Sequence, residues 1–512
     1  MNQGYPRRWA VLGVLCLAVF VVSIDTTVLN VALPTMSRDL GASAEALSWI
    51  IDAYTLVLAG VLLTAGSLSD RYGRKRLLMI GLVVFAVASA IGALAQEPWQ
   101  VIAARGLMGV GGSFFMPGTL SILVHVFPPE ERTKALGRWG AVTAMGMVLG
   151  PLLGGLLLEH FWWGSMFVAN IPVVLVALIG VAWIVPESSD PVTRRADIPG
   201  TLLSTLAMGG ILYGVISAPS HGWESLPVLA GLIGGVVVLV LFFVRQTTAR
   251  EPMLDLRLMR SRKFLGSSGT MACLMFALMG GAFVVTQHLQ FVLDFSPLSA
   301  GLATVPLAAA IIVSSTVVPV VARALGPRVT IALGLTSMAA GLVALAFLAP
   351  GAGYPPTALG LVGLGVGMGL AVAPVNDVLM SAGPPESSGR LSAMNDTVQE
   401  LGSAFGIAII GSVLALAYGK GLPADAPSGA QHSLSEAVET AQGTPGGGGS
   451  LLDVARDAFG HSMTVSMSVC AGVALLGAFV ALVVLPREKT PHSGPAEVRP
   501  APERETVTLM TE

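Results

Sequence analysis

Long apolar segments, each about the length that crosses a lipid bilayer, recur along the whole of this 512-residue chain. Hydrophobic residues make up 54% of the sequence and charged residues only 11%. A soluble domain has about 25% charged residues, so this chain could not cover a water-exposed surface. Because about 20 apolar residues span a bilayer as a helix, we predict an all-α integral membrane protein. Its fourteen transmembrane helices are expected near residues 9–33, 47–68, 77–96, 99–124, 136–159, 165–185, 198–217, 226–246, 264–288, 298–322, 329–349, 357–380, 392–418 and 462–485.

The distribution of basic residues orients these helices. With fourteen helices, 24 of the 28 Lys and Arg residues fall at the N-terminus, in alternate loops or in the C-terminal tail. The loops of the other side contain only Arg38, Lys420 and Arg456, and Arg105 lies within a helix. By the positive-inside rule, we expect both termini in the cytoplasm, with the chain crossing the plasma or inner cell membrane many times.

Polar linkers divide the predicted helices into groups of six, two and six. We expect an N-terminal six-helix bundle at residues 1–186 and two inserted helices with basic linkers at 187–263. A C-terminal six-helix bundle follows at 264–485 and includes a long outer loop at 419–461. Residues 486–512 are polar and rich in proline, which predicts a disordered cytoplasmic tail.

No pattern in the sequence indicates an enzyme, a metal or a bound cofactor. The three cysteines lie in apolar runs without paired or metal-type spacing. No nucleotide-binding loop and no nucleophile–base arrangement occurs at a recognisable spacing. The net charge of −2 argues against nucleic acid as a partner. We therefore expect membrane lipids and small molecules as the partners of a monomeric chain.

A glycine-containing basic turn follows the second predicted helix, with the sequence GSLSDRYGRKR at residues 66–76. Glycines there permit close approach and unusual backbone angles, and the acid can pair with a basic residue or lie at a helix N-terminus. The basic residues can equally serve only as an anchor at the anionic inner leaflet. Residues 323–328 weakly resemble this turn in sequence, which favours a chain built from two related halves. The residues of this conformational gate motif are Gly66, Asp70, Arg71, Gly73 and Arg74.

The fifth predicted helix has glycines at every fourth position around the sequence LGPLLGG at residues 149–155. Gly146, Gly150 and Gly154 give a smooth face for close helix contact, and Pro151 permits a kink. From the residues alone, this is a packing face.

Together these two motifs resemble the signature loop and the antiporter motif of the major facilitator superfamily. The sequences DTTVLNVALP at 25–34, WIIDAY at 49–54 and RGLMGVG at 105–111 are similar to its fourteen-helix drug:proton antiporter branch. EHFWWG at 159–164, with NIP at 170–172, resembles the quaternary-ammonium and multidrug efflux pumps of that branch. The resemblance implies two pseudo-symmetric six-helix bundles and alternating access.

Ionisable side chains inside the predicted helices are the candidates for function, because a charge at the bilayer centre costs from about 2.5 kcal/mol upward. Asp25 in the first helix is a candidate for proton or substrate binding. The alternative is a structural hydrogen bond with Asn30 or with a facing helix. Arg105 in the fourth helix needs an acid or backbone carbonyl groups as partners, and the resemblance implies a role in proton coupling.

Three further acids lie within predicted helices. Asp396 and Glu400 are four residues apart and so share one helix face, which suits a site where protons and a cationic drug compete. The alternative is a polar helix face near the inner leaflet. Asp52 is expected about one turn inside the outer end of the second helix, as a gate or proton-entry acid or as a solvated charge at the rim.

The sequence thus predicts a proton-coupled multidrug efflux antiporter for lipophilic, often cationic, compounds, which would confer antibiotic resistance. Two other functions stay open. One is a dedicated exporter of a single endogenous metabolite or antibiotic, and the other is a membrane sensor that binds without net transport.

Overall fold

The computed structural model describes residues 5–189, 197–249, 261–348, 353–383, 388–423 and 448–485, with single positions between 427 and 440. Every regular element of these residues is a helix. The first half of the chain and the inserted pair form α1 Arg8–Leu40, α2 Ala44–Tyr72, α3 Arg74–Ala93, α4 Pro98–Gly112, α5 Phe115–Val126, α6 Pro129–His160, α7 Ser165–Ile184, α8 Ile198–His221 and α9 Leu226–Thr248. The rest forms α10 Arg262–Gln287, the π-helix η2 His288–Val292, α11 Pro297–Leu302, α12 Val305–Leu325, α13 Pro327–Ala346, α14 Tyr354–Met380, α15 Ser388–Gly421 and α17 Gly448–Val484.

The helices are long and apolar enough for a membrane protein. Thirteen segments of the described chain have the length and composition of a membrane span, with α4–α5, α10–η2 and α11–α12 each counting as one. The 32-residue α6 is not among the thirteen; as a further span it would bring the number to fourteen. The all-helical membrane fold is therefore confirmed, and the count of fourteen stays a prediction.

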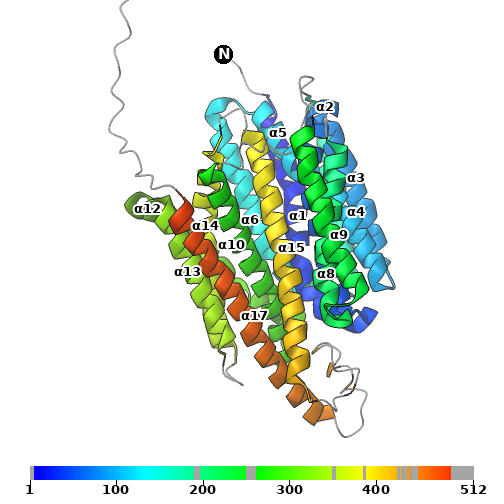
Figure 1. Cartoon of the computed structure of the whole chain (residues 1–512). Coiled ribbons are helices and arrows are strands. Elements are labelled where there is room, and N and C mark those ends of the chain that lie inside the picture. The colour runs from blue at the N-terminus through cyan, green and yellow to red at the C-terminus, as the bar shows by residue number, and fades with distance from the viewer. Residues whose placement is uncertain are drawn as a thin grey trace, which may run out of the picture.

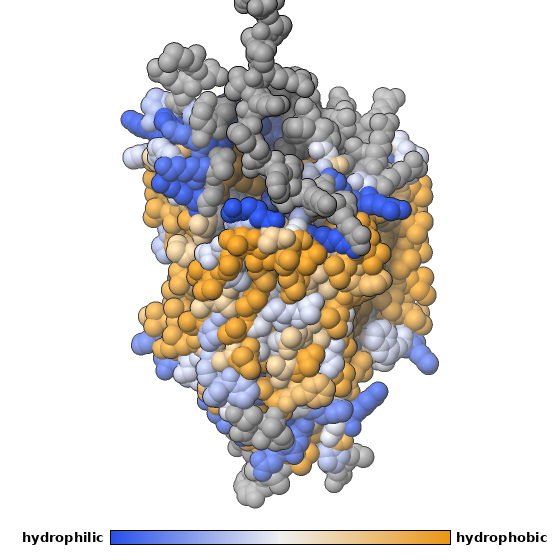
Figure 2. All heavy atoms as spheres, turned by 90° about the vertical axis from the view of Figure 1, so that its left-hand side faces the viewer, coloured by the Kyte–Doolittle hydropathy of each residue, from blue (hydrophilic) through white to orange (hydrophobic). Residues whose placement is uncertain are grey.

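Hydrophobic side chains gather in the middle of one face of the molecule (Figure 2). On the face seen in Figure 2 they cover the middle of the surface, and hydrophilic residues lie toward both ends. The first turn of α1 and the last turn of α17 lie at the same end of the helices (Figure 1). We call this the termini end and the other the far end.

Contacts sort the helices into two bundles and a pair. In the N-terminal bundle, α1 packs on α6 and α7, α2 packs on α4, and α3 packs on α4 and α7. In the C-terminal bundle, α10 packs on α15 and α17, and α14 packs on α12 and α13. The inserted helices α8 and α9 pack on each other, and α8 also contacts α2 and α15, one helix from each bundle (Figure 1).

A single glycine separates consecutive helices at equivalent places in the two bundles. Gly73 stands between α2 and α3 with φ 111°, and Gly326 stands between α12 and α13 with φ 81°. Residues with a Cβ rarely adopt these angles, so glycine at both places permits a turn without a loop. The weak sequence echo between these turns therefore corresponds to a shared local structure.

The predicted outer loop and last helix need correction. We expected a loop over 419–461 and a helix from 462, whereas α17 begins at Gly448. A helix that extends beyond the bilayer has a polar end, which a search for apolar runs does not detect. Arg456 in this extension binds Asp294 through bonds of 2.6 and 2.7 Å. The tail at 486–512 and most of 424–447 lie outside the described residues.

Candidate functional site

A buried ion pair joins α1 to α4. The Arg105 guanidinium donates to the Asp25 carboxylate, and each residue is only 1% exposed. The other Asp25 oxygen accepts a hydrogen bond of 2.9 Å from the Asn170 side-chain amide on α7. Both carboxylate oxygens thus have partners on facing helices. Of the two structural alternatives for Asp25, the structure shows the facing helix and not Asn30.

Arg105 has two further contacts, both with α2. Its Nε donates to the Ile50 carbonyl oxygen at 3.1 Å. Its guanidinium carbon lies 4.2 Å from the centre of the Tyr54 ring, a cation–π distance. Arg105 therefore has both kinds of partner expected from the cost of its burial, an acid and a backbone carbonyl.

The acids of α15 lie opposite this pair. Asp396 and Glu400 are partly buried and one helical turn apart. Glu400 interacts electrostatically with Asp396 and with Arg105, and Tyr54 lies within the fields of both Asp25 and Glu400. Arg105 therefore pairs with Asp25 of its own bundle and interacts electrostatically with Glu400 of the other bundle.

Asp52 of α2 is fully buried, with an exposed fraction of 0%. The expectation of a solvated charge at the rim is therefore wrong. No hydrogen-bond partner among the described residues reaches either of its carboxylate oxygens. Asp52 lies on the side of α2 that also carries Trp49 and Leu56, which pack in a cluster with Leu212 and other residues of α8 and α15. Residues of α8 and α15 thus pack beside an acid for which the sequence left open a gate or proton-entry role and a solvated position at the rim.

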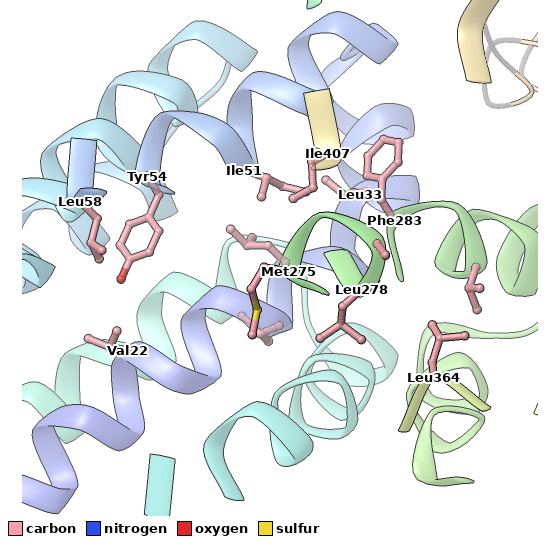
Figure 3. Close-up of a cluster of buried hydrophobic side chains, with 14 of the residues drawn as sticks. Val22, Leu33, Ile51, Tyr54, Leu58, Met275, Leu278, Phe283, Leu364 and Ile407 are labelled. Atoms are coloured by element: carbon pink, nitrogen blue, oxygen red, sulfur yellow. The ribbon is translucent and has the colours of Figure 1, made fainter. Parts of the chain in front are cut away.

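Apolar side chains from both bundles surround these charges. Figure 3 shows Tyr54 of α2, Val22 of α1 and Met275 of α10 within one buried cluster, with Ile407 of α15 close to Ile51. A low-polarity environment of this kind strengthens interactions between charges.

The glycine face of α6 packs against α1. A Cβ atom added at Gly146 would lie 2.7 Å from the Ser23 Cβ, and one added at Gly154 would lie 3.0 Å from the Val28 carbonyl oxygen. At Gly150 the added atom would meet the Thr27 hydroxyl. Glycine at these positions therefore permits the close approach of α6 to α1.

The same region of α6 also contacts α11 of the other bundle. The Pro151 carbonyl oxygen lies so close to Gly301 that a Cβ there would overlap it. A Cβ at Gly155 would lie 2.6 Å from the Leu298 Cα. Gln290 of η2 also donates to the Val31 carbonyl oxygen of α1 at 2.9 Å. These contacts between the bundles lie toward the far end.

The gate motif forms a compact corner at the termini end. The Arg74 guanidinium donates to Asp70 at 2.7 Å, one turn away across the helix break. The backbone N–H of Gly73 donates to the Ser69 carbonyl oxygen at 3.1 Å. Glu187, which follows α7, accepts from the Lys75 backbone N–H at 3.1 Å. Asp70 therefore pairs with a basic residue of its own motif, one of the two expected arrangements.

The remaining motif residues have simpler surroundings. Gly66 packs near Pro117 of α5, where an added Cβ would be in ordinary contact at 3.5 Å. The Arg71 guanidinium lies 5.5 Å from the centre of the Tyr72 ring. Within the described residues, no group of three or more His, Cys, Asp or Glu side chains could hold a metal ion.

Two residues of the site were not identified as such from the sequence. Asn170 and Tyr54 occur in the quoted sequences NIP and WIIDAY, but no role was assigned to them. The available signal was a polar side chain two residues before a proline in an apolar helix, and a tyrosine two residues after Asp52. Their contacts with Asp25 and Arg105 depend on packing between distant segments.

Comparison with known proteins gives matches over nearly the whole chain. A family model described as Major Facilitator Superfamily matches residues 15–407. The multidrug efflux pump LfrA of Mycolicibacterium smegmatis is 35% identical over 489 residues, covering 94% of this chain and 97% of that protein. The methyl viologen resistance protein SmvA of Salmonella typhimurium is 35% identical over 480 residues, covering 92% and 97%. A bacterial homologue of the human lysosomal transporter Spinster, in an inward-facing and unoccupied conformation, is 18% identical with a TM-score of 0.64, covering 94% of this chain and 99% of that one.

Proposed function

The chain belongs to the major facilitator superfamily, and we propose that it exports lipophilic, often cationic, compounds across the cell membrane in exchange for protons. It is a transporter and not an enzyme, and its relatives LfrA and SmvA are named for drug efflux and resistance. Drug efflux is thus supported by whole-chain relatives. The coupling to protons, the residues responsible and the cytoplasmic position of both termini are our inference from the residues.

One observation carries the proposed coupling: the buried Arg105 pairs with an acid of its own bundle and interacts electrostatically with an acid of the other bundle. It forms a buried ion pair with Asp25 and also interacts electrostatically with Glu400. A proton on Glu400 removes the attraction between Arg105 and α15, whereas an ionised Glu400 restores it. Protonation can therefore change the energy with which the two bundles attract each other.

Asp396 and Glu400 are the proposed site of competition between protons and drug. Two carboxylates one helical turn apart repel each other when both are ionised, and so they titrate as a pair. Either a proton or a lipophilic cation relieves that repulsion. Asp52 is proposed as a further proton-carrying acid, since it is buried beside α15 with no partner among the described residues.

The arrangement of the bundles supports alternating access. Their contacts through α6 and α11, and through Gln290 and Val31, lie toward the far end. With the termini in the cytoplasm, this corresponds to a conformation closed toward the outside. The corner formed by Asp70, Gly73 and Arg74 is proposed to reorganise when the termini end closes. A membrane potential of 100 mV supplies about 2.3 kcal/mol per net charge moved, and each pH unit supplies about 1.4 kcal/mol per proton.

The test is proton-gradient-driven uptake of ethidium into inverted membrane vesicles. We expect uptake by the wild type to collapse with a protonophore, and to fall at least tenfold in Asp25→Asn and in Glu400→Gln. Asp457→Asn and Glu159→Gln are the matched controls, because both acids are exposed. Uptake that persists without a proton gradient contradicts the coupling. Unchanged uptake in Asp25→Asn or Glu400→Gln, at wild-type protein levels, removes that residue from the site.

Substrate breadth is tested separately. Cells that produce the protein are challenged with a panel of unrelated toxic lipophilic cations. Protection against several compounds is expected for a multidrug exporter. Protection against a single compound assigns the chain as a dedicated exporter that uses the same site.

A further inference from the structure

A line of polar side chains follows one side of α2 from the far end toward the middle of the membrane. Glu45, Ser48 and Asp52 are spaced by three and four residues, so they share one helix face. Because α1 begins at the termini end and α2 follows it after three residues, α2 begins at the far end. Glu45 stands in its first turn, and Asp52 lies about 10 Å deeper, at a rise of about 1.5 Å per residue.

The inserted helix α8 meets this line at the far end. Ser217 of α8 donates a hydrogen bond to the Glu45 carboxylate, and the His221 Nδ1 lies 4.0 Å from the same carboxylate. His221 is exposed and Glu45 is partly buried, whereas Ser217 is fully buried. Two ionisable side chains, one on α2 and one on α8, therefore stand together where the line reaches the surface.

Helix α15 closes the contact line between α2 and α8, which we call the seam. Ser412 of α15 donates to the Val215 carbonyl oxygen of α8 at 2.6 Å. A Cβ atom added at Gly411 of α15 would lie 3.0 Å from the Ser48 Oγ of α2. Apolar residues of the same three helices form one cluster beside Asp52. Asp52 is fully buried beneath these contacts.

The inserted helix is fastened to α2 more firmly than α15 is fastened to either. The hydroxyl groups of Thr64 and Thr201 share a hydrogen bond between α2 and α8 toward the termini end, and Glu45 and Ser217 join the same two helices at the far end. Helix α15 belongs to the C-terminal bundle and meets α8 in the far half of the membrane through Ser412. A movement of the bundles that opens the far end would thus leave α8 on α2 and draw α15 away.

Charged groups of the candidate site reach α2 from another direction. Arg105 contacts α2 through Ile50 and Tyr54, which stand two residues before and after Asp52 and therefore on the opposite side of the helix. Glu400 of α15 interacts electrostatically with Arg105 and Tyr54. The apolar cluster beside Asp52 has no ionisable member among the described residues. In this part of the chain, the ionisable groups that follow Asp52 along the seam are those at the far end.

We propose that the seam is the proton inlet of the transporter and leads from Glu45 and His221 at the far-end surface to Asp52. This inference rests on the proposed exchange for protons and gives α8 a part in it. When α15 withdraws, water enters the seam. The Glu45 carboxyl group then passes its proton through that water to the Asp52 carboxylate and takes another from the solvent, with His221 as a second proton-binding group beside it. The return of α15 separates the protonated Asp52 from the far side.

The first test measures proton movement and drug binding separately. Ethidium added to inverted vesicles with an acidic lumen should release protons, recorded as recovery of a quenched acridine dye. In Glu45→Gln the amide oxygen still accepts from Ser217 but the side chain carries no proton, so release should fall at least tenfold. The Kd of the purified protein for ethidium should stay within twofold of the wild-type value.

Two further variants separate the relay from a structural role of Glu45. Glu45→Asp keeps an ionisable carboxyl group and should retain proton release. Glu224→Gln is the matched control, because Glu224 is exposed between α8 and α9 at the same end of the molecule. It should release protons as the wild type does.

The second test determines from which side the seam opens. Asp52→Cys and Ser48→Cys are made in a chain whose three native cysteines are replaced by alanine, and a membrane-impermeant methanethiosulfonate reagent is added during ethidium transport. Both positions should react in right-side-out vesicles and not in inverted ones. Glu224→Cys is the control for the far side and Arg262→Cys, exposed at the start of α10, for the termini side. Two seam positions are used so that a folding defect in one variant does not decide the outcome.

Two results overturn the proposal. The first is wild-type proton release in Glu45→Gln. The second is labelling of positions 48 and 52 from the termini side, or from neither side. The labelling decides whether the seam opens to the far side even if export is not driven by protons, whereas a wild-type protein from which ethidium releases no protons would refute the exchange itself.

Discussion

Removing the buried ion pair of Arg105 should reveal how much the site depends on it. In Asp25→Asn, Arg105 stays buried without its carboxylate partner, and breaking a buried pair from one side costs about 3–5 kcal/mol of unfolding free energy. Arg105 keeps the Ile50 carbonyl oxygen and the Tyr54 ring, and Asn170 can still bond the new amide. We therefore expect a loss near the lower limit, about 3 kcal/mol.

A double-mutant cycle isolates the interaction itself. In Asp25→Asn, Arg105→Gln neither side chain carries a charge, so the double variant should lose clearly less than the two single variants together, with a coupling of about 2–3 kcal/mol. The control cycle uses Asp294 and Arg456, a pair at the surface whose coupling should be about 0–1 kcal/mol. Unfolding by denaturant in mixed micelles measures all variants. If the buried pair couples no more strongly than the surface pair, its burial has no energetic consequence and the reasoning is refuted.

Three other perturbations follow from the structure. Gly150→Val should push α1 away from α6, lower the unfolding free energy by about 1–3 kcal/mol and abolish ethidium transport. Gly140→Val should keep wild-type stability and transport, because a Cβ added there meets no atom within 4 Å. Equal effects in the two variants would contradict the packing argument. Gly73→Ala forces an L-residue to φ 111° and should cost about 1–2 kcal/mol in thermal unfolding; a wild-type melting temperature would show that the turn is not strained. At the membrane edge, the Arg8 guanidinium lowers the pKa of the Glu131 carboxyl group through their hydrogen bond; the stability from this pair is present above the unfolded-state pKa and is lost as pH falls through the lower folded-state pKa. Melting temperature should therefore fall more on acidification in the wild type than in Glu131→Gln, and parallel curves would count against a role for the pair.

The fold could be predicted from the sequence because its main determinant is local. A run of apolar residues predicts each membrane helix by itself. The order of the helices along the chain therefore follows without knowledge of contacts between distant segments. The ends of the helices were harder to predict from the sequence. α1 continues to Leu40 and α17 begins at Gly448, beyond the apolar runs, because a helix that leaves the bilayer no longer needs apolar side chains.

The sequence identified residues of the candidate site but not which of them contact each other. The cost of burying a charge is a property of one residue in an apolar helix, so Asp25 and Arg105 could be identified. Their geometry depends on tertiary packing: Asn170 is 145 residues from Asp25 in the chain, whereas Asn30, the nearby alternative, is not its partner. The solvated-rim alternative for Asp52 was wrong for the same reason, since α8 and α15, which pack beside it, lie far downstream in the chain.

The charge balance of the site explains why neutralising different acids should have opposite effects. Arg105 is the one cation that the described part of the chain buries among these acids; it pairs with Asp25 and also interacts electrostatically with Glu400 of the other bundle. Neutralising Asp25 leaves Arg105 to interact with Glu400, which strengthens the attraction between the bundles. Neutralising Glu400 leaves Arg105 with Asp25 and weakens that attraction. In the proposed mechanism, a proton on one acid shifts the electrostatic interaction of Arg105 toward the other acid, and we propose that this shift converts a titration into relative movement of the two bundles.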